Sequence, residues 1–171
     1  SVRAQGRGRM AGSNVTVTAN QGNAQQGVAN SVDVAGTLQG GSITILGNQG
    51  SARDGGTVNS VVGNGRISGG QITIVGNTGS AHAGLANSVR ADGNVTASNI
   101  TILGNQASVQ GEGSKVNSVS GSGSIRGSQI LIAGNTGRAS GGWLVNGVHN
   151  RGTLAGAQVV ITGNQGSDTG G

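Results

Sequence analysis

The sequence predicts an all-β repeat protein, and three observations lead to that prediction. A phrase of alternating Ile, Val and Thr that ends in Gly-Asn or Ala-Asn recurs along the chain, and its asparagines are 28, 29, 28, 30 and 29 residues apart. The 171 residues include 37 Gly and one aromatic residue, with no Pro and no Cys. The recurring apolar residues are mostly Ile and Val, which favour strands. A fixed period of this length is typical of stacked repeats.

Two apolar columns precede the phrase asparagine and are predicted to face the core. They lie five and three positions before it, so the alternation of side chains along a strand places both on one face. The first column consists of Val15, Ile43, Ile72, Ile100, Ile130 and Val159. The second column consists of Val17, Ile45, Ile74, Ile102, Ile132 and Ile161. Threonine fills the position between them in four repeats, and we expect it to face outward.

Asparagine occupies two positions of the repeat and predicts two ladders. The phrase asparagines are Asn20, Asn48, Asn77, Asn105, Asn135 and Asn164. A second phrase, Asn-Ser-Val or Asn-Gly-Val, contributes Asn30, Asn59, Asn87, Asn117 and Asn146. Side-chain amides at matching positions of stacked strands can hydrogen-bond to one another. Asparagine is also a tolerant corner residue, but two whole columns favour ladders.

These columns predict a β-solenoid with cross-β-like stacking. Each repeat has enough apolar residues for two or three short strands between Gly-rich corners, and too few to bury a core alone. Six coils at a strand spacing of about 4.8 Å give a rod of roughly 29 Å. The expected organisation is one repeat domain, 1–171. Its predicted parts are a partial coil 1–13, repeats near 14–41, 42–70, 71–98, 99–128 and 129–157, and a partial coil 158–171.

The charge is positive but dispersed. Ten Lys and Arg against five Asp and Glu give a formal net charge of +5 and a pI near 11.7. No aromatic platform accompanies the charges, so we expect at most weak contact with a polyanion. One column carries no like formal charges on adjacent coils, which avoids repulsion at this spacing. Its members are Arg3, Asp33, Val62, Arg90, Ser120 and His149.

The sequence offers little for chemistry. Its Gly-rich stretches lack the residue order of a phosphate-binding loop, and its carboxylates and two histidines are scattered over the repeats. We therefore expect no enzyme activity, no cofactor and no metal. No apolar run is long enough to span a membrane.

The two ends of the chain predict self-association. The start, Ser1, Val2 and Arg3, aligns with the middle of a repeat, and the end, from Asn164 and Gln165 to Gly171, aligns with the stretch before it. Neither end carries a helix, a proline or a charged cap, although monomeric solenoids usually need one. We expect head-to-tail contacts between copies, which do not close and so build a filament. A first residue other than Met fits a removed export leader, and a chain boundary fits equally.

The Asn- and Gln-rich corners resemble those of bacterial functional amyloids, the curli and Fap-type fibres. Examples run from Asn20 to Gln26 and from Asn48 to Ala52, and the resemblance is one of architecture, not a residue-level match. It implies an exported subunit of surface or biofilm-matrix fibres, with copies of itself, and a nucleator or anchoring protein, as partners.

Two other classes of function stay open at this stage. One is a binding module, such as the stalk or passenger segment of a repeat adhesin, or an ice-binding solenoid with an outward Thr face. The other is a solenoid enzyme acting on polysaccharide, which would need clustered acids that this sequence lacks. The self-assembling fibre subunit is the favoured hypothesis.

Overall fold

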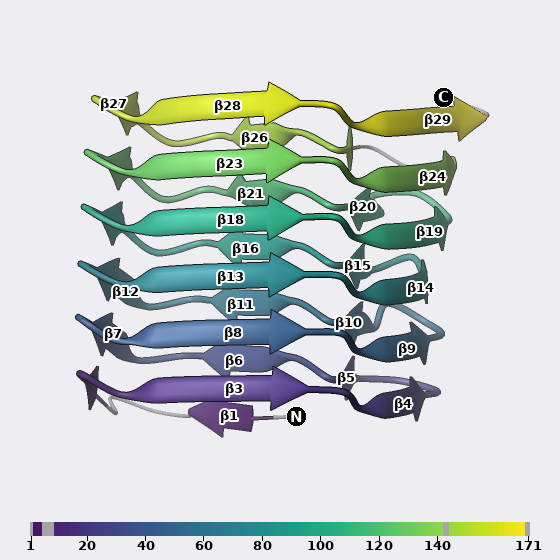
Figure 1. Ribbon diagram of the computed structural model, residues 1–171, viewed down its shortest axis with the longest axis horizontal. Helices are drawn as coiled ribbons and strands as arrows, with labels where there is room; N and C mark the ends of the chain where they lie inside the picture. The colour runs from purple at the N-terminus through teal and green to yellow at the C-terminus, as the bar shows by residue number, and fades with distance from the viewer. Residues whose placement is uncertain (1, 5–8, 142–143, 170–171) are drawn as a thin grey trace.

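The computed structural model describes residues 2–4, 9–141 and 144–169, and the regular structure in these residues is all β. Its strands form five sheets, which we name A to E, and each coil adds one strand to each sheet in turn (Figure 1). Every pairing is parallel and joins equivalent residues of adjacent coils, as in Ile43 with Ile72 and Ile72 with Ile100. The predicted β-solenoid is confirmed.

Sheets A and B are adjacent along the chain and consist of strands of two or three residues. Sheet A consists of β1 (Val2–Ala4), β6 (Val32–Val34), β11 (Val61–Gly63), β16 (Val89–Ala91), β21 (Val119–Gly121) and β26 (Val148–Asn150). Sheet B consists of β2 (Arg9–Ala11), β7 (Thr37–Gln39), β12 (Arg66–Ser68), β17 (Val95–Thr96), β22 (Ile125–Arg126) and β27 (Leu154–Ala155).

Sheets C, D and E complete the coil. Sheet C consists of β3 (Asn14–Thr18), β8 (Ser42–Leu46), β13 (Gln71–Val75), β18 (Asn99–Leu103), β23 (Gln129–Ala133) and β28 (Gln158–Thr162). Sheet D consists of β4 (Gln21–Ala24), β9 (Gln49–Ala52), β14 (Thr78–His82), β19 (Gln106–Gln110), β24 (Thr136–Ser140) and β29 (Gln165–Thr169). Sheet E has five strands: β5 (Val28–Ala29), β10 (Thr57–Val58), β15 (Leu85–Ala86), β20 (Lys115–Val116) and β25 (Leu144–Val145).

A complete coil contains five strands, so the prediction of two or three per repeat is wrong. Residues in the left-handed backbone region interrupt the extended chain at its corners. Gly76 has a φ of 61° between sheets C and D, and Asn59 has a φ of 47° between sheets E and A. Glycine adopts this conformation readily and asparagine tolerates it, whereas the flanking β-branched residues do not. The corners therefore divide each repeat into short segments.

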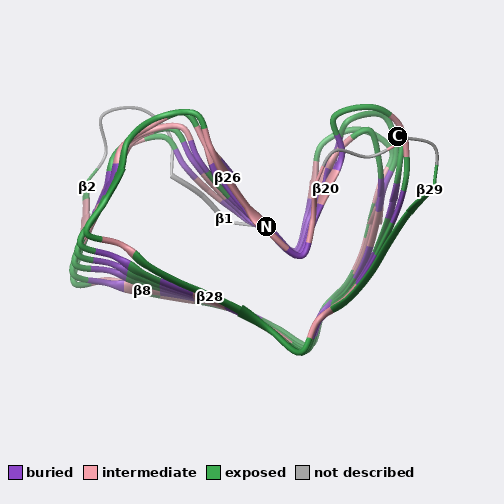
Figure 2. Cartoon of the chain, turned by 90° about the horizontal axis from the view of Figure 1, so that it is seen from above, coloured by how far each residue is buried: buried purple, intermediate pink, exposed green. Residues whose placement is uncertain are grey.

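Viewed along its axis, the coil has two lobes (Figure 2). Sheets A, B and C enclose a large lobe filled by Ile, Val and Leu. Sheets D and E enclose a small lobe filled by Ala and Val. The chain crosses between the lobes at two corners, one joining C to D and the other joining E to A. We call this constriction the waist.

The core of the large lobe confirms the inward columns. Each of these side chains is at most 1% exposed: Ile43, Ile45, Ile72, Ile74, Ile100, Ile102, Ile130 and Ile132. Leu38, Ile67, Val95 and Ile125 of sheet B are buried opposite them. Burying one such side chain fully contributes about 1.5–3 kcal/mol. Since a single coil offers only a few, stacking is what makes the core continuous.

Candidate functional site

The first predicted ladder lies at the corner between sheets C and D. From Asn20 to Asn164, the backbone N–H and the Nδ2 of each asparagine donate to the Oδ1 of the next, at 2.9–3.1 Å. The four middle members are Asn48, Asn77, Asn105 and Asn135, and all are buried. Hydrogen bonds in such a buried row depend on the exact register of the coils.

The same asparagines also satisfy carbonyl groups of the preceding coil. The Nδ2 of Asn77 donates to the carbonyl of Ile45 at 2.9 Å, and that of Asn105 donates to Ile74 at 2.9 Å. These carbonyls belong to the core strands, where an unpaired polar group costs free energy. The ladder therefore links the corner to the large-lobe core.

The second predicted ladder lies at the corner between sheets E and A. Its members are Asn30, Asn59, Asn87, Asn117 and Asn146, and the Nδ2 of each donates to the Oδ1 of the next at 2.9–3.2 Å. All five have a positive φ of 45–50°. Asparagine therefore meets two requirements at this corner, the left-handed backbone and the side-chain amide.

The two ladders meet across the waist, which the sequence did not reveal. The Nδ2 of Asn59 donates to the carbonyl of Thr78 in sheet D at 2.9 Å, and equivalent bonds recur in the other coils. The Nδ2 of Asn87 also lies 3.4 Å from the carbonyl of Asn77. The waist is thus a polar layer between two apolar cores. Its asparagine amides donate to backbone carbonyls of both lobes.

A row of serines next to the second ladder was also missed. Ser31, Ser60, Ser88 and Ser118 are fully buried. The backbone N–H of Ser60 donates to the Oγ of Ser31 at 3.0 Å, and the N–H of Ser88 donates to the Oγ of Ser60 at 2.9 Å. The sequence signal for this row was the recurrence of serine in Asn-Ser-Val. If the corner needed only a small side chain, Ala or Gly would serve as well, so repeated serine indicates that the hydroxyl is used.

The C-terminal end of the stack exposes residues of the core columns. Leu154 is 47% exposed and Ile161 is 49% exposed, although their equivalents one coil earlier, Ile125 and Ile132, are completely buried. In Figure 1, β28 and β29 are the uppermost strands and no further coil lies above them. Apolar side chains of the core columns are therefore uncovered at this end.

The residues of the predicted junction lie at opposite ends of the stack. Val2 and Arg3 belong to β1, at one edge of sheet A, and only their backbone is described. Asn164 and Gln165 lie at the other end, next to or within β29. Ser1 and Gly171 fall outside the described residues. One chain therefore does not bring the junction residues together.

The ladder has a direction that bears on such a contact. Along the row, the backbone N–H of each asparagine donates to the Oδ1 of the next asparagine toward the C-terminal end. Asn164 donates to the carbonyl of Ile132 of the preceding coil, and its Oδ1 accepts from Asn135. Its backbone N–H is oriented to donate to a further coil, and Asn20 at the other end carries an acceptor oxygen. The two ends of the row are chemically complementary.

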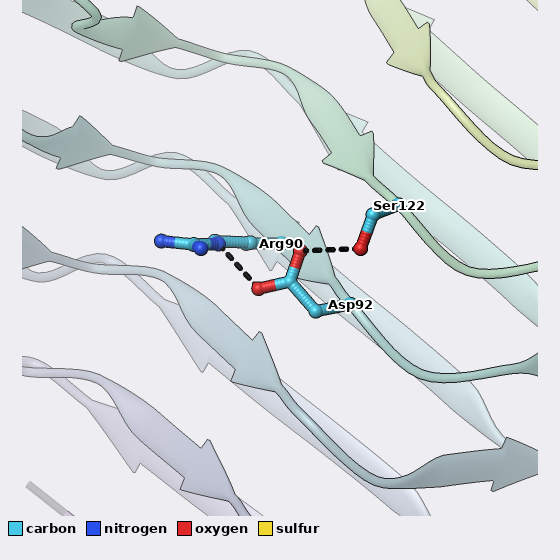
Figure 3. Close-up of polar contacts among 3 residues, drawn as sticks. All are labelled: Arg90, Asp92 and Ser122. Carbon is cyan, nitrogen blue, oxygen red and sulfur yellow. Dashed lines mark hydrogen bonds and ion pairs between the residues drawn. The ribbon is translucent and has the colours of Figure 1, made fainter.

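The predicted charge column also forms. Strand pairing aligns Arg3 with Asp33, then Val62, Arg90, Ser120 and His149 on successive coils. Next to it, the Nε of Arg90 donates to Asp92 at 2.7 Å, and the Oγ of Ser122 donates to the other oxygen of Asp92 at 3.4 Å (Figure 3).

Within the described part of the chain, no group of three or more His, Asp or Glu could hold a metal ion. The same residues include no helix of the length and apolarity that crossing a membrane requires. Comparison with known proteins found no matching family model, no matching curated protein and no matching solved structure.

Proposed function

We propose that this protein is a structural subunit of a self-assembling extracellular filament, which grows when the first coil of one copy stacks on the last coil of another. The observation that supports this proposal is the exposed end of the core. Leu154, Val159 and Ile161 belong to columns that are buried in the interior coils, yet each is 37–49% exposed. Covering them would remove apolar surface from water, at about 25 cal/mol per Å².

In this arrangement, the strands of sheets A to D continue in order from copy to copy. β1 of the incoming copy pairs with β26, β2 with β27, β3 with β28 and β4 with β29. The N–H of Asn164 donates to Asn20 of the incoming copy, as each asparagine does to the next within the chain. Such a contact is heterologous and does not close, so it builds an open filament. The extracellular setting, and a nucleator or anchoring protein as partner, come from the architectural resemblance to bacterial functional amyloids.

A second candidate is a stalk or passenger segment of a longer repeat adhesin. Sheet E favours it, because this sheet has five strands where the others have six. Stacking a second copy leaves sheet E one two-residue strand short, whereas continuation of the same polypeptide would supply that strand. In this candidate, the exposed columns are covered by the next coil of the same chain.

A matched pair of substitutions on one strand tests the filament. Ile161→Lys places a charge on the core side of β28, and Val160→Lys places it on the outer face, where Val160 is already 51% exposed. We expect the unmodified protein and Val160→Lys to form fibres with an axial repeat of about 29 Å in electron microscopy, which is six strand spacings. Ile161→Lys should stay monomeric with an unchanged β circular dichroism spectrum.

A stable monodisperse monomer for all three proteins would refute the filament and favour the adhesin segment. Equal fibre formation by all three would show that copies associate through another surface.

A further inference from the structure

A groove runs along the side of the stack where sheets A and E diverge from the waist. In Figure 2, the traces of β26 and β20 diverge from the waist, and side chains of both sheets line a cavity between them. From β6 to β26, the middle residue of each sheet A strand faces it, as does the first residue of each sheet E strand, because their neighbours point into the lobe cores. On the sheet E wall these residues are Val28, Thr57, Leu85, Lys115 and Leu144. Lys115 is the one charged residue in a row that is otherwise apolar or Thr.

Three consecutive coils place cations around one cavity in this groove. The cavity has a volume of about 180 Å³, and Arg90, Lys115 and Arg151 line it together with His149, Asp92 and Ser122. Arg90 comes from the coil below, Lys115 from the middle coil across the groove, and Arg151 from the coil above. Three cationic side chains and one carboxylate line the cavity, so positive charge is in excess there.

Lys115 is held in an unfavourable environment. Partial burial lowers the pKa of its ammonium group, and the nearby Arg90 and Arg151 lower the pKa further, against the opposing effect of Asp92. Asp92 is already engaged by Arg90 at 2.7 Å and by Ser122. One carboxylate and three cationic side chains line the cavity, so a further negative group would be favoured there.

A buried hydroxyl lies in the strand beside the cavity lining. Ser120 stands in register between Arg90 and His149, both of which line the cavity. Its side chain is fully buried, and its Oγ has no hydrogen-bond partner among the described residues. Ser120 is not among the residues that line the cavity, so it is the lining cations that favour a ligand there.

We propose that this cavity binds a single tetrahedral oxyanion group, a sulfate or a phosphate. Cations approach from below, from above and from across the groove, which suits oxygens pointing in several directions better than the two coplanar oxygens of a carboxylate. Elsewhere in the groove, the described side chains facing it include one charged group, Asp33, so a long polyanion would find no continuing row of cations. The site lies on the side of the rod and is independent of stacking at its ends.

The chain itself supplies a conservative variant for the test. Lys115→Leu installs the residue that Leu85 and Leu144 already provide at the equivalent position of the two adjacent coils, so the fold should tolerate it. The matched control is Arg66→Gln, which removes one charge from an exposed residue of sheet B. Isothermal titration calorimetry with sodium sulfate and with sodium phosphate, at constant ionic strength set with chloride, measures binding. Dextran sulfate and uncharged dextran form two further arms.

We expect saturable binding of one inorganic sulfate or phosphate per chain. Affinity should fall at least about tenfold in Lys115→Leu, since one charge-assisted hydrogen bond contributes that much, and should be unchanged in Arg66→Gln. Dextran sulfate that binds more tightly and loses affinity in the same variant would identify the group as a sulfate ester of a polysaccharide. Binding of the inorganic ion alone would identify a free ion. No saturable binding, or equal affinity in all three proteins, would overturn the proposal.

Discussion

The two lobes of the coil show two ways of building a core from the same short repeat. The large lobe uses long side chains on three sheets, so its walls stand apart and Ile meets Val and Leu between them. The small lobe uses Ala and Val on two sheets that lie close together. At Gly50 of sheet D, an added Cβ would lie 2.6 Å from the Cγ1 of Val58 in sheet E. Side-chain volume therefore dominates one core, and close backbone approach dominates the other.

The largest expected effect is in the large lobe. Ile74→Ala removes three carbons from a side chain with no exposed surface, between stacked equivalents in the coils above and below. Because the stacked backbone cannot collapse into the space, we expect a loss of about 4 kcal/mol in the free energy of unfolding, measured by urea denaturation with circular dichroism. A loss under about 1 kcal/mol would mean that Ile74 does not lie in a packed core.

The waist should be the next most sensitive region. Asn77→Ala leaves the N–H of Asn48 and the carbonyl of Ile45 without their partners. Losing these buried hydrogen bonds should cost about 3 kcal/mol in the same measurement. Asn64→Ala is the control, since Asn64 lies exposed in a corner outside both ladders. Equal effects at the two asparagines would contradict a ladder at the waist.

A smaller loss in the free energy of unfolding is expected for a substitution in the small lobe. The same substitution at a neighbouring exposed residue should not destabilise the protein. Ala81 is buried, so Ala81→Gly should cost about 1 kcal/mol through lost packing and greater freedom of the unfolded chain. Ala83 is exposed with a φ of 53°, so Ala83→Gly should relieve strain and leave stability unchanged or slightly raised. If Ala81→Gly cost as much as Ile74→Ala, the contrast between the lobes would be wrong.

The smallest effect is expected on the outer face of sheet C. Thr73 is half-buried there, and the equivalent position holds Leu131 and Val160 in later coils. Thr73→Val should change the free energy of unfolding by less than about 0.5 kcal/mol. A larger loss would show that this hydroxyl has a structural role.

The sequence predicted the parts of the fold that repeat strictly. The period, the inward columns and both Asn rows followed from recurrence alone, because stacked coils require equivalent residues at equivalent places. It did not predict the path of the chain between columns. Whether Asn59 turns the chain sharply depends on its backbone conformation, and the meeting of Asn59 with Thr78 depends on the resulting two-lobed shape.

The cationic cavity was also beyond what the sequence could predict. Arg90, Lys115 and Arg151 are far apart in sequence and differ from their counterparts in other coils, so no recurrence marks them. Their convergence became visible only when the register of three coils was combined with the angle between sheets A and E. The ends of the stack were anticipated as uncapped, but the exposed core residues at β28 needed the structure.

The most direct test of the central claim, a coil held at its waist by stacked asparagines, is hydrogen exchange of side-chain amides measured by NMR. The Nδ2 protons of Asn48, Asn77, Asn105 and Asn135 should exchange at least about a hundredfold more slowly than those of the exposed Asn64 and Asn94, because exchange requires local opening of the stack. Exchange of both groups at the same rate would contradict the account.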